Sequence, residues 1–131
     1  MIRLSLPQEP YWLDLAGGAR VKVKPLTSAD HVAAHGHARQ DADAKNGIVR
    51  DVDGKCPDET DMIRLNADYF QSFAIHLALD GIVEWEGVGD KDGNLAEVTP
   101  ENIKTLAMTP GINFATKYTE FMNAVKSEGN A

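Results

Sequence analysis

The chain has 131 residues, of which 43% are hydrophobic and 25% are charged, values that fit one globular domain and argue against wholesale disorder. Its 20 acidic and 13 basic residues give a formal net charge of -7. This charge argues against nonspecific binding to nucleic acid or to an anionic membrane, and it favours a protein partner. The single cysteine, Cys56, excludes an intramolecular disulfide and a thiolate zinc cluster, and so favours a reducing compartment.

Three short segments near the amino terminus alternate between apolar and polar residues, at 2–6, 11–15 and 21–24. This alternation has the period of half-buried strands. The connection at 16–20 contains two glycines, which predicts that the second and third segments pair as a hairpin. An isolated hairpin is marginally stable, so we expect a helix to cover its apolar face.

Trp12 falls on the polar side of its predicted strand. An exposed Trp commonly marks a contact surface, whereas a Trp at the edge of a core simply covers that edge. The sequence leaves both alternatives open for Trp12.

A first helix is predicted over 27–44, where Thr27 and Asp30 have the spacing of a capping box. Its apolar positions are mainly Val32 and alanines, so it should bury little area. We therefore expect it to dock loosely or to become ordered with a partner. The loop at 46–58 that follows is expected to be mobile.

The strongest helical pattern spans 59–79, with Asp58 as its predicted N-cap. One face of this helix is spaced by four and three residues and is expected to form the core. The face comprises Ile63, Ala67, Phe70, Ala74 and Leu77.

The last two turns of this helix are apolar nearly all round, because Ile75 and Leu79 lie away from the predicted core face. Such a helix is either central or half covered by a second subunit. Gly81 is predicted to end the helix, and Trp85 to continue into the core.

Residues 83–106 predict a structural junction between two helices. Asp92 and Gly93 form a turn signal, because Gly accepts a positive φ and Asp bonds to nearby backbone. Thr99 can cap a helix whose first position suits Pro100. We expect Trp85 to lie in the core at this junction.

Two helices are predicted after the junction, a short one at 100–107 and an amphipathic last one. The apolar face of the last helix comprises Phe114, Tyr118, Phe121, Met122 and Val125.

The sequence thus predicts one α+β domain over 1–131 that is mostly α-helical. An N-terminal β-hairpin or three-stranded sheet in 1–25 should pack against about four helices in 27–127, with a frayed tail at 128–131.

Histidines offer the best metal candidates, because His31 and His35 are four residues apart on the first helix, and His37 is near. Zinc normally takes three or four protein ligands, and no HExxH motif is present. We therefore interpret these three residues as solvated surface histidines. His76, inside an apolar helix, is interpreted as a core or interface histidine.

The loop from Asp90 has acidic or amide residues at several positions of an EF-hand. Leu95 stands where the sharp turn needs Gly, Val98 replaces a polar ligand, and Pro100 falls within the loop. The aspartates therefore indicate a turn. No catalytic, metal or cofactor site is predicted, and we expect no enzyme activity.

The order of motifs after the apolar helix resembles tail assembly chaperones of long-tailed bacteriophages and prophages. The resemblance covers about 75–125. It is carried by VEWEGV at 83–88, DKDGN at 90–94 and VTPEN at 98–102. In that group a helix runs into a W-x-G-V element, a D-x-D-G turn and a T-P-E-N helix start.

The resemblance implies a non-catalytic protein that binds the tape-measure protein and helps to recruit tail-tube subunits. Many such proteins also have a longer frameshifted form. A holding chaperone needs exposed apolar surface. The expected partner-binding surface comprises Trp12, Val32, Phe73 and Leu79 with neighbouring residues of 27–44. Self-association is left open, and no nucleic acid or membrane is expected as a partner.

The sequence leaves two rival functions open. One is a structural minor tail or neck protein that stays in the virion, and the other is a small metal-dependent hydrolase that uses His31 and His35. The amino terminus shows no secretory signal, and no window approaches the length of about 20 apolar residues that spans a bilayer. The chaperone hypothesis places the protein in the host cytoplasm and outside the mature virion.

Overall fold

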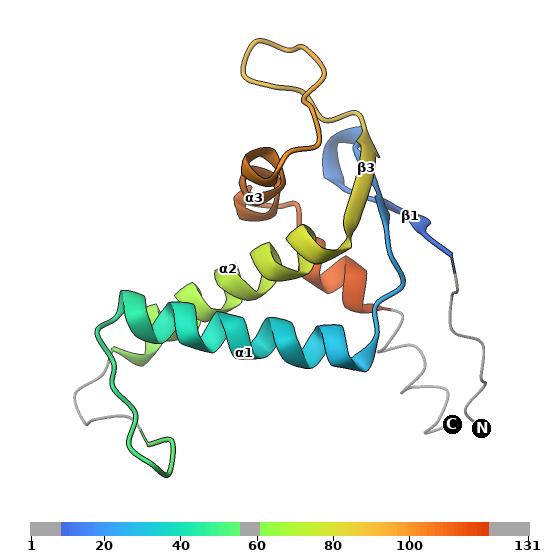
Figure 1. Ribbon diagram of the computed structural model, residues 1–131. Coiled ribbons are helices and arrows are strands. Elements are labelled where there is room, and N and C mark those ends of the chain that lie inside the picture. Colours follow the sequence, from blue (N-terminus) through green and yellow to red (C-terminus); the bar gives the residue numbers. More distant parts are fainter. Residues whose placement is uncertain (1–8, 56–60, 121–131) are drawn as a thin grey trace.

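The computed structural model describes residues 9–55 and 61–120 (Figure 1). A small three-stranded sheet stands at one end of two long helices that lie against each other, and shorter helical segments pack beside the sheet. The predicted α+β, mostly helical class is confirmed.

The first two strands, β1 (Tyr11–Asp14) and β2 (Arg20–Val23), flank a short 3-10 turn, η1 (Ala16–Gly18). The predicted hairpin is confirmed, because Tyr11 pairs with Val23 and Asp14 pairs with Arg20. The alternating segment at 2–6 lies outside the described residues. Side chains on one face of β2 are fully buried, and those on the other face lie at the surface.

The third strand, β3 (Ile82–Glu86), comes from far along the chain. It pairs antiparallel with β2, so that Trp85 lies opposite Val21 and the sheet order is β1-β2-β3. The backbone N–H of Lys24 donates to the carbonyl of Gly81 at 2.8 Å, which fastens the end of β2 to the residue before β3.

Helix α1 (Ser28–Lys45) begins at the predicted capping box. The Asp30 N–H donates to Thr27 Oγ1 at 3.1 Å, and the Thr27 N–H donates to Asp30 Oδ2 at 3.2 Å. The expectation of loose docking is wrong. One face of α1 is buried through the alanines Ala34, Ala38 and Ala42. Small side chains let two helix backbones approach closely, so a helix with little apolar area still packs tightly.

Helix α2 (Met62–Gly81) is capped by Asp61, whose Oδ1 accepts from the N–H groups of Ile63 and Arg64 at 3.1 and 3.2 Å. The prediction that Asp58 caps this helix is therefore wrong, and Asp58 itself lies outside the described residues. Gly81 is the last helical residue, as expected, but not because of a positive φ. A Cβ at Gly81 would lie 2.6 Å from Tyr118 Oη, so glycine is needed for close packing.

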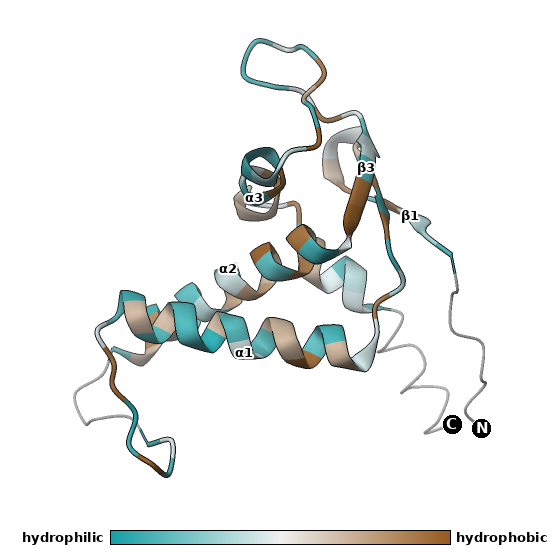
Figure 2. Ribbon diagram, viewed as in Figure 1, coloured by the Kyte–Doolittle hydropathy of each residue, from teal (hydrophilic) through white to brown (hydrophobic). Residues whose placement is uncertain are grey.

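The predicted core face of α2 is only half correct. Leu77 is buried, but Ile63 is 84% exposed and Phe70 is 66% exposed. The buried side chains of α2 are instead Leu65, Asp68, Ser72, Phe73, Leu77 and Ala78. The reason is the position of the neighbouring elements. Helix α1 covers the opposite side of α2, and the sheet stands beside only its C-terminal end, where Figure 2 shows strongly hydrophobic turns next to β3.

Helix α3 (Pro100–Met108) begins at the predicted cap, where Thr99 Oγ1 accepts from the Asn102 N–H at 3.2 Å. The last helix is described over 114–120, and the rest of its predicted apolar face lies outside the described residues. One core cluster joins these elements to the sheet. Its buried members are Leu15, Ala19, Val21, Val23, Ala34, Ala38, Phe73, Leu77, Ala78, Ile82, Ile103, Leu106, Phe114 and Tyr118.

Candidate functional site

The four residues expected to bind a partner do not form one surface. Trp12 is half-buried on the outer face of the sheet, with the Arg20 guanidinium 4.6 Å from its ring. Val32 is exposed on α1, whereas Leu79 packs partly against the core. Phe73 is buried, so its inclusion in a partner surface is wrong. Its ring stacks on that of His35 across the α1–α2 interface, with centroids 4.1 Å apart.

The largest exposed apolar side chains on one helix face belong instead to the first half of α2. We define the α2 stripe as Met62, Ile63, Asn66, Ala67 and Phe70, all of which are exposed. The part of α2 that carries the stripe extends beyond the sheet (Figure 1). Met62, Asn66 and Phe70 also lie beside α1, because they line one hollow with Arg39, Ala42 and Asp43. The stripe contains no charged side chain. Sequence periodicity found this face but predicted it to be buried.

The α2 stripe leads into a hollow of about 490 Å³, which we call the corner hollow. Phe70 and Met108 are exposed at its edge, and the buried Phe73 and Phe114 line it. The remaining lining residues are Gln71, Ala74, Ala107, Thr109, Asn113, Ala115, Thr116 and Thr119. None of the lining residues carries a charge. The corner hollow therefore suits an apolar side chain rather than an ionic ligand.

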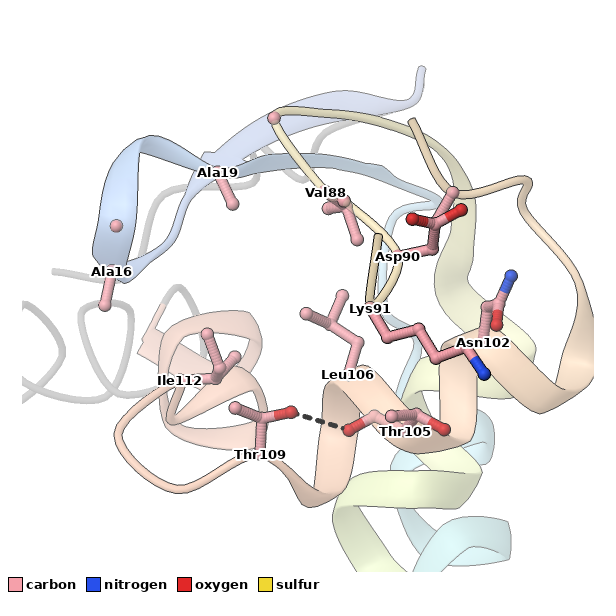
Figure 3. A pocket seen from close by; sticks show the side chains of 14 residues that line it. Ala16, Ala19, Val88, Asp90, Lys91, Asn102, Thr105, Leu106, Thr109 and Ile112 are labelled. Carbon is pink, nitrogen blue, oxygen red and sulfur yellow. Dashed lines mark hydrogen bonds between the residues drawn. The ribbon is translucent and has the colours of Figure 1, made fainter. Parts of the chain in front are cut away.

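A second hollow, of about 580 Å³, lies at the predicted junction (Figure 3). Val88, Leu106 and Ile112 line its apolar part. The hydroxyl of Thr109 donates to the Thr105 carbonyl at 2.8 Å, and the Asn102 side chain donates to the Glu97 carbonyl at 2.9 Å. These donors already serve the backbone, so they do not form a set of convergent groups for a ligand.

The junction residues fix the path of the chain from β3 to α3. Trp85 is half-buried, and its Nε1–H donates to the Ala96 carbonyl at 2.9 Å. Gly93 has a φ of 83°, as a turn glycine should. The carboxylate that organises the turn belongs to Asp90, which accepts from the backbone N–H groups of Asp92 and Asn94 at 2.9 and 3.0 Å. Asp92 contributes its backbone.

All four histidines lie along the interface of α1 and α2. The ring of His31 meets that of His35 edge-on with centroids 4.6 Å apart, and His35 Nδ1 is hydrogen-bonded to the Tyr69 hydroxyl. On the other flank, His37 stacks on His76 with centroids 4.9 Å apart. The interpretation of His31 and His35 as solvated surface histidines is therefore wrong, whereas His76 is an interface histidine as predicted.

The polar groups of this interface pair with one another. Asp41 Oδ2 accepts from Ser72 Oγ and lies 2.7 Å from His76 Nε2. Within 9–55 and 61–120, no group of three or more His, Cys, Asp or Glu side chains is arranged to hold a metal ion. The histidines thus act as packing and hydrogen-bonding residues between two helices.

The packing shifts the ionisation of three side chains. Burial, followed by the charge of His31, lowers the pKa of His35. Hydrogen bonds from His76 and Ser72 lower the pKa of Asp41. Burial by itself would raise the pKa of Asp68, but hydrogen bonds from Asn46 and Lys45, together with the charge of Arg64, hold it below the ordinary value.

We expect the free energy of unfolding to fall on mild acidification, because His35 ionises less readily in the folded protein. Its pKa is lowered from 6.5, so the unfolded chain takes up the proton first. Stability is therefore full above pH 6.5 and is lost as pH falls toward the pKa of the folded state. The lowered pKa values of Asp41 and Asp68 act only below their ordinary value of 3.8. Urea denaturation between about pH 7.5 and about pH 5.5 measures the effect.

The matched variant is His35→Phe, which keeps an aromatic ring against Phe73 and removes the titrating group. Its free energy of unfolding should change less over the same pH range. An unchanged pH dependence in this variant would show that other groups cause the effect.

No protein-family model, curated protein or solved structure matches the chain. In the part of the chain that the structure describes, no helix has the length and apolar character to cross a bilayer.

Proposed function

We propose that this protein is a tail assembly chaperone of a long-tailed bacteriophage or prophage. It binds the tape-measure protein in the host cytoplasm, helps to recruit tail-tube subunits and catalyses no reaction. The α2 stripe carries the proposal, because Ile63 and Phe70 expose large apolar side chains on a helix that is otherwise well packed. Contiguous exposed apolar surface is typical of a protein-binding site.

The motif order supports the choice of partner. The residues that resemble tail assembly chaperones form the end of β3, the turn at 90–94 and the start of α3. None of these elements lines the corner hollow or belongs to the stripe, so the motifs support the choice of partner and not the position of the contact. The resemblance and the apolar surface are independent observations, since the stripe at 62–70 lies outside the segment at 75–125 that carries the resemblance.

The client-binding mode that suits this surface is helix-in-groove packing. An amphipathic client helix places its apolar residues on the α2 stripe, and its end reaches the corner hollow. Burial of one large apolar side chain stabilises such a complex by about 1.5–3 kcal/mol. The net charge of -7 keeps the complex soluble while the apolar surface is in use.

The proposed surface replaces the one expected from the sequence. Phe70 and Ile63 take the place of Phe73 and Leu79, because the first half of α2 exposes two side chains that periodicity predicted to be buried. Trp12 lies on the sheet face under Arg20 and is not needed for the contact.

Coexpression with the tape-measure protein tests the proposal. A tagged chain should keep that protein soluble and retain it on a resin, whereas Ile63→Asp with Phe70→Asp should lose most of it. Val32→Asp is the matched control, because it places the same charge on an equally exposed apolar position of α1. Undiminished retention by the α2 double variant would contradict the proposed surface.

Purified phage particles provide the second measurement. A chaperone leaves the assembled tail, so the protein should be present in infected-cell lysate and absent from particles. Its presence in particles at a fixed stoichiometry would favour a structural tail or neck component instead.

A further inference from the structure

We infer that the client helix presents a carboxylate to Arg39 and, about two helical turns away, a large apolar side chain to the corner hollow. The carboxylate enters a further hollow beside α2, which we call the arginine hollow. This inference rests on the proposed function, because it takes the client to be a helix of the tape-measure protein that packs along the α2 stripe.

The arginine hollow lies between α1 and α2 and has a volume of about 270 Å³. Its lining combines apolar side chains, two of them exposed, with groups that can bind an anion. The apolar and aromatic lining residues are Ala42, Met62, Leu65, Tyr69 and Phe70, and the polar ones are Arg39, Asp43, Arg50 and Asn66. The hollow therefore suits a segment that is both apolar and charged.

Arg39 supplies the positive charge of this hollow. The Asp43 carboxylate is bound by Arg50, whose Nε and Nη2 donate to its two oxygens at 2.6 and 2.9 Å. Among residues 9–55 and 61–120, no carboxylate lies within ion-pair distance of the exposed Arg39. The lining thus has an excess of positive charge, although the chain as a whole has a net charge of -7.

This local charge selects the chemistry of the client. A basic segment would be attracted to many parts of an acidic surface, and that attraction would not fix its position. A carboxylate is disfavoured by an acidic surface in general and favoured beside Arg39, so it fixes where the client helix lies. A guanidinium binds a carboxylate through two parallel N–H groups. The exposed amide of Asn66 in the same hollow can donate a further hydrogen bond.

The spacing of the two hollows sets the spacing of the client residues. Phe70 lines both hollows, so one helix packed along the α2 stripe reaches both. Asn66 in the arginine hollow and Phe73 in the corner hollow lie about two turns apart on α2, roughly 10 Å along its axis. A client helix covers this length with about two turns of its own. Its carboxylate and its apolar side chain therefore share one face.

Synthetic peptides that together cover the tape-measure protein test the inference by fluorescence anisotropy with the full chain. We expect the tightest-bound peptide to carry Asp or Glu about two turns from a large apolar residue. Arg39→Gln should weaken its binding about tenfold, the usual cost of losing a hydrogen bond to a charged group. Arg39→Lys keeps the charge and should retain most of the affinity. Lys104→Gln is the matched control, because it removes the same charge from an exposed position of α3.

A double-mutant cycle shows whether the peptide carboxylate meets Arg39. Replacing that carboxylate with the corresponding amide should weaken binding to the native chain about as much as Arg39→Gln does. The same replacement should have little further effect on binding to Arg39→Gln. Added salt should weaken the native complex more than the complex of this variant, because salt screens the ion pair. Equal losses in both backgrounds would overturn the inference.

Two outcomes separate a failure of this inference from a failure of the proposed function. If the native chain binds none of the peptides, both are wrong. If the native chain binds a peptide, and binding is lost in Ile63→Asp with Phe70→Asp but unchanged in Arg39→Gln, the inference alone is wrong.

Measurements without peptide test whether Arg39 serves the protein in another way. The free energy of unfolding of Arg39→Gln should equal that of the native chain, because the side chain is exposed. A clear loss of stability would mean that the guanidinium serves the fold, and it would overturn the inference. Sedimentation of the two proteins should show no difference in association. A native dimer that Arg39→Gln abolishes would assign the hollow to a second copy and would also overturn the inference.

Discussion

Phe114→Ala should lower the free energy of unfolding by about 3–5 kcal/mol, the usual cost of removing a buried aromatic ring. Phe114 is almost completely buried, and its ring lies 5.3 Å from that of Tyr118 in the core cluster. Because a domain of this size is stabilised by only about 5–15 kcal/mol, the loss should be visible as a large shift of the urea midpoint.

Phe70→Ala is the matched control, because it removes the same ring from an exposed position of α2. Its effect should stay below about 1 kcal/mol, because the Phe70 side chain is mostly in water. Similar losses for the two variants would mean that Phe70 is buried, as the periodicity of α2 predicted, and would also remove the basis of the proposed contact surface.

Gly81→Ala should lower the free energy of unfolding by about 1–3 kcal/mol, the typical cost of forcing extra volume into a packed core. The added Cβ would lie 2.6 to 2.8 Å from three atoms of the Tyr118 ring and hydroxyl. That ring cannot move away easily, because it is buried and its hydroxyl donates to the Lys24 carbonyl at 2.5 Å. Thermal or urea unfolding measures the loss.

Gly36→Ala is the control for this substitution. Gly36 lies in the middle of α1, and a Cβ there would meet nothing within 4 Å. Alanine is a better helix former than glycine by about 1 kcal/mol, so this variant should be more stable than the native chain. Two glycines replaced by the same residue thus have effects of opposite sign. A gain in stability at Gly81 would show that Tyr118 does not pack against it.

The caps show how far local sequence rules reach. The capping box of Thr27 with Asp30 and the cap at Thr99 before Pro100 are predicted from a few neighbouring residues, and both caps are present. The hairpin was predicted in the same way, since its two strands are joined by a short turn. Asp58 failed as a cap because Asp61 three residues later satisfies the same local rule, and sequence spacing does not distinguish the two.

The candidate site was less accessible to sequence reasoning. Periodicity placed Phe70 and Ile63 on one apolar face of α2. It does not contain the information on which part of that face is covered by the sheet, α3 and the last helix. Alanines on α1 were interpreted as weak packing, yet they allow the close helix pair that buries Phe73 beside His35. For the apolar face of α2 and for the alanine face of α1, the sequence does not show which other element packs against that face.

The sequence by itself determined the elements: a hairpin, the positions of the helices after it, the caps of α1 and α3, and an acidic chain without a known metal-binding motif. Hydrogen bonds between near neighbours and the alternation of apolar residues are properties of a few consecutive residues, so these features can be recognised before folding. The tertiary structure alone decided that β3 completes the sheet, that Gly81 gives room to Tyr118, and that the α2 stripe stays in water. Those outcomes depend on contacts between distant segments, which determine which apolar face is covered and which remains available to another protein.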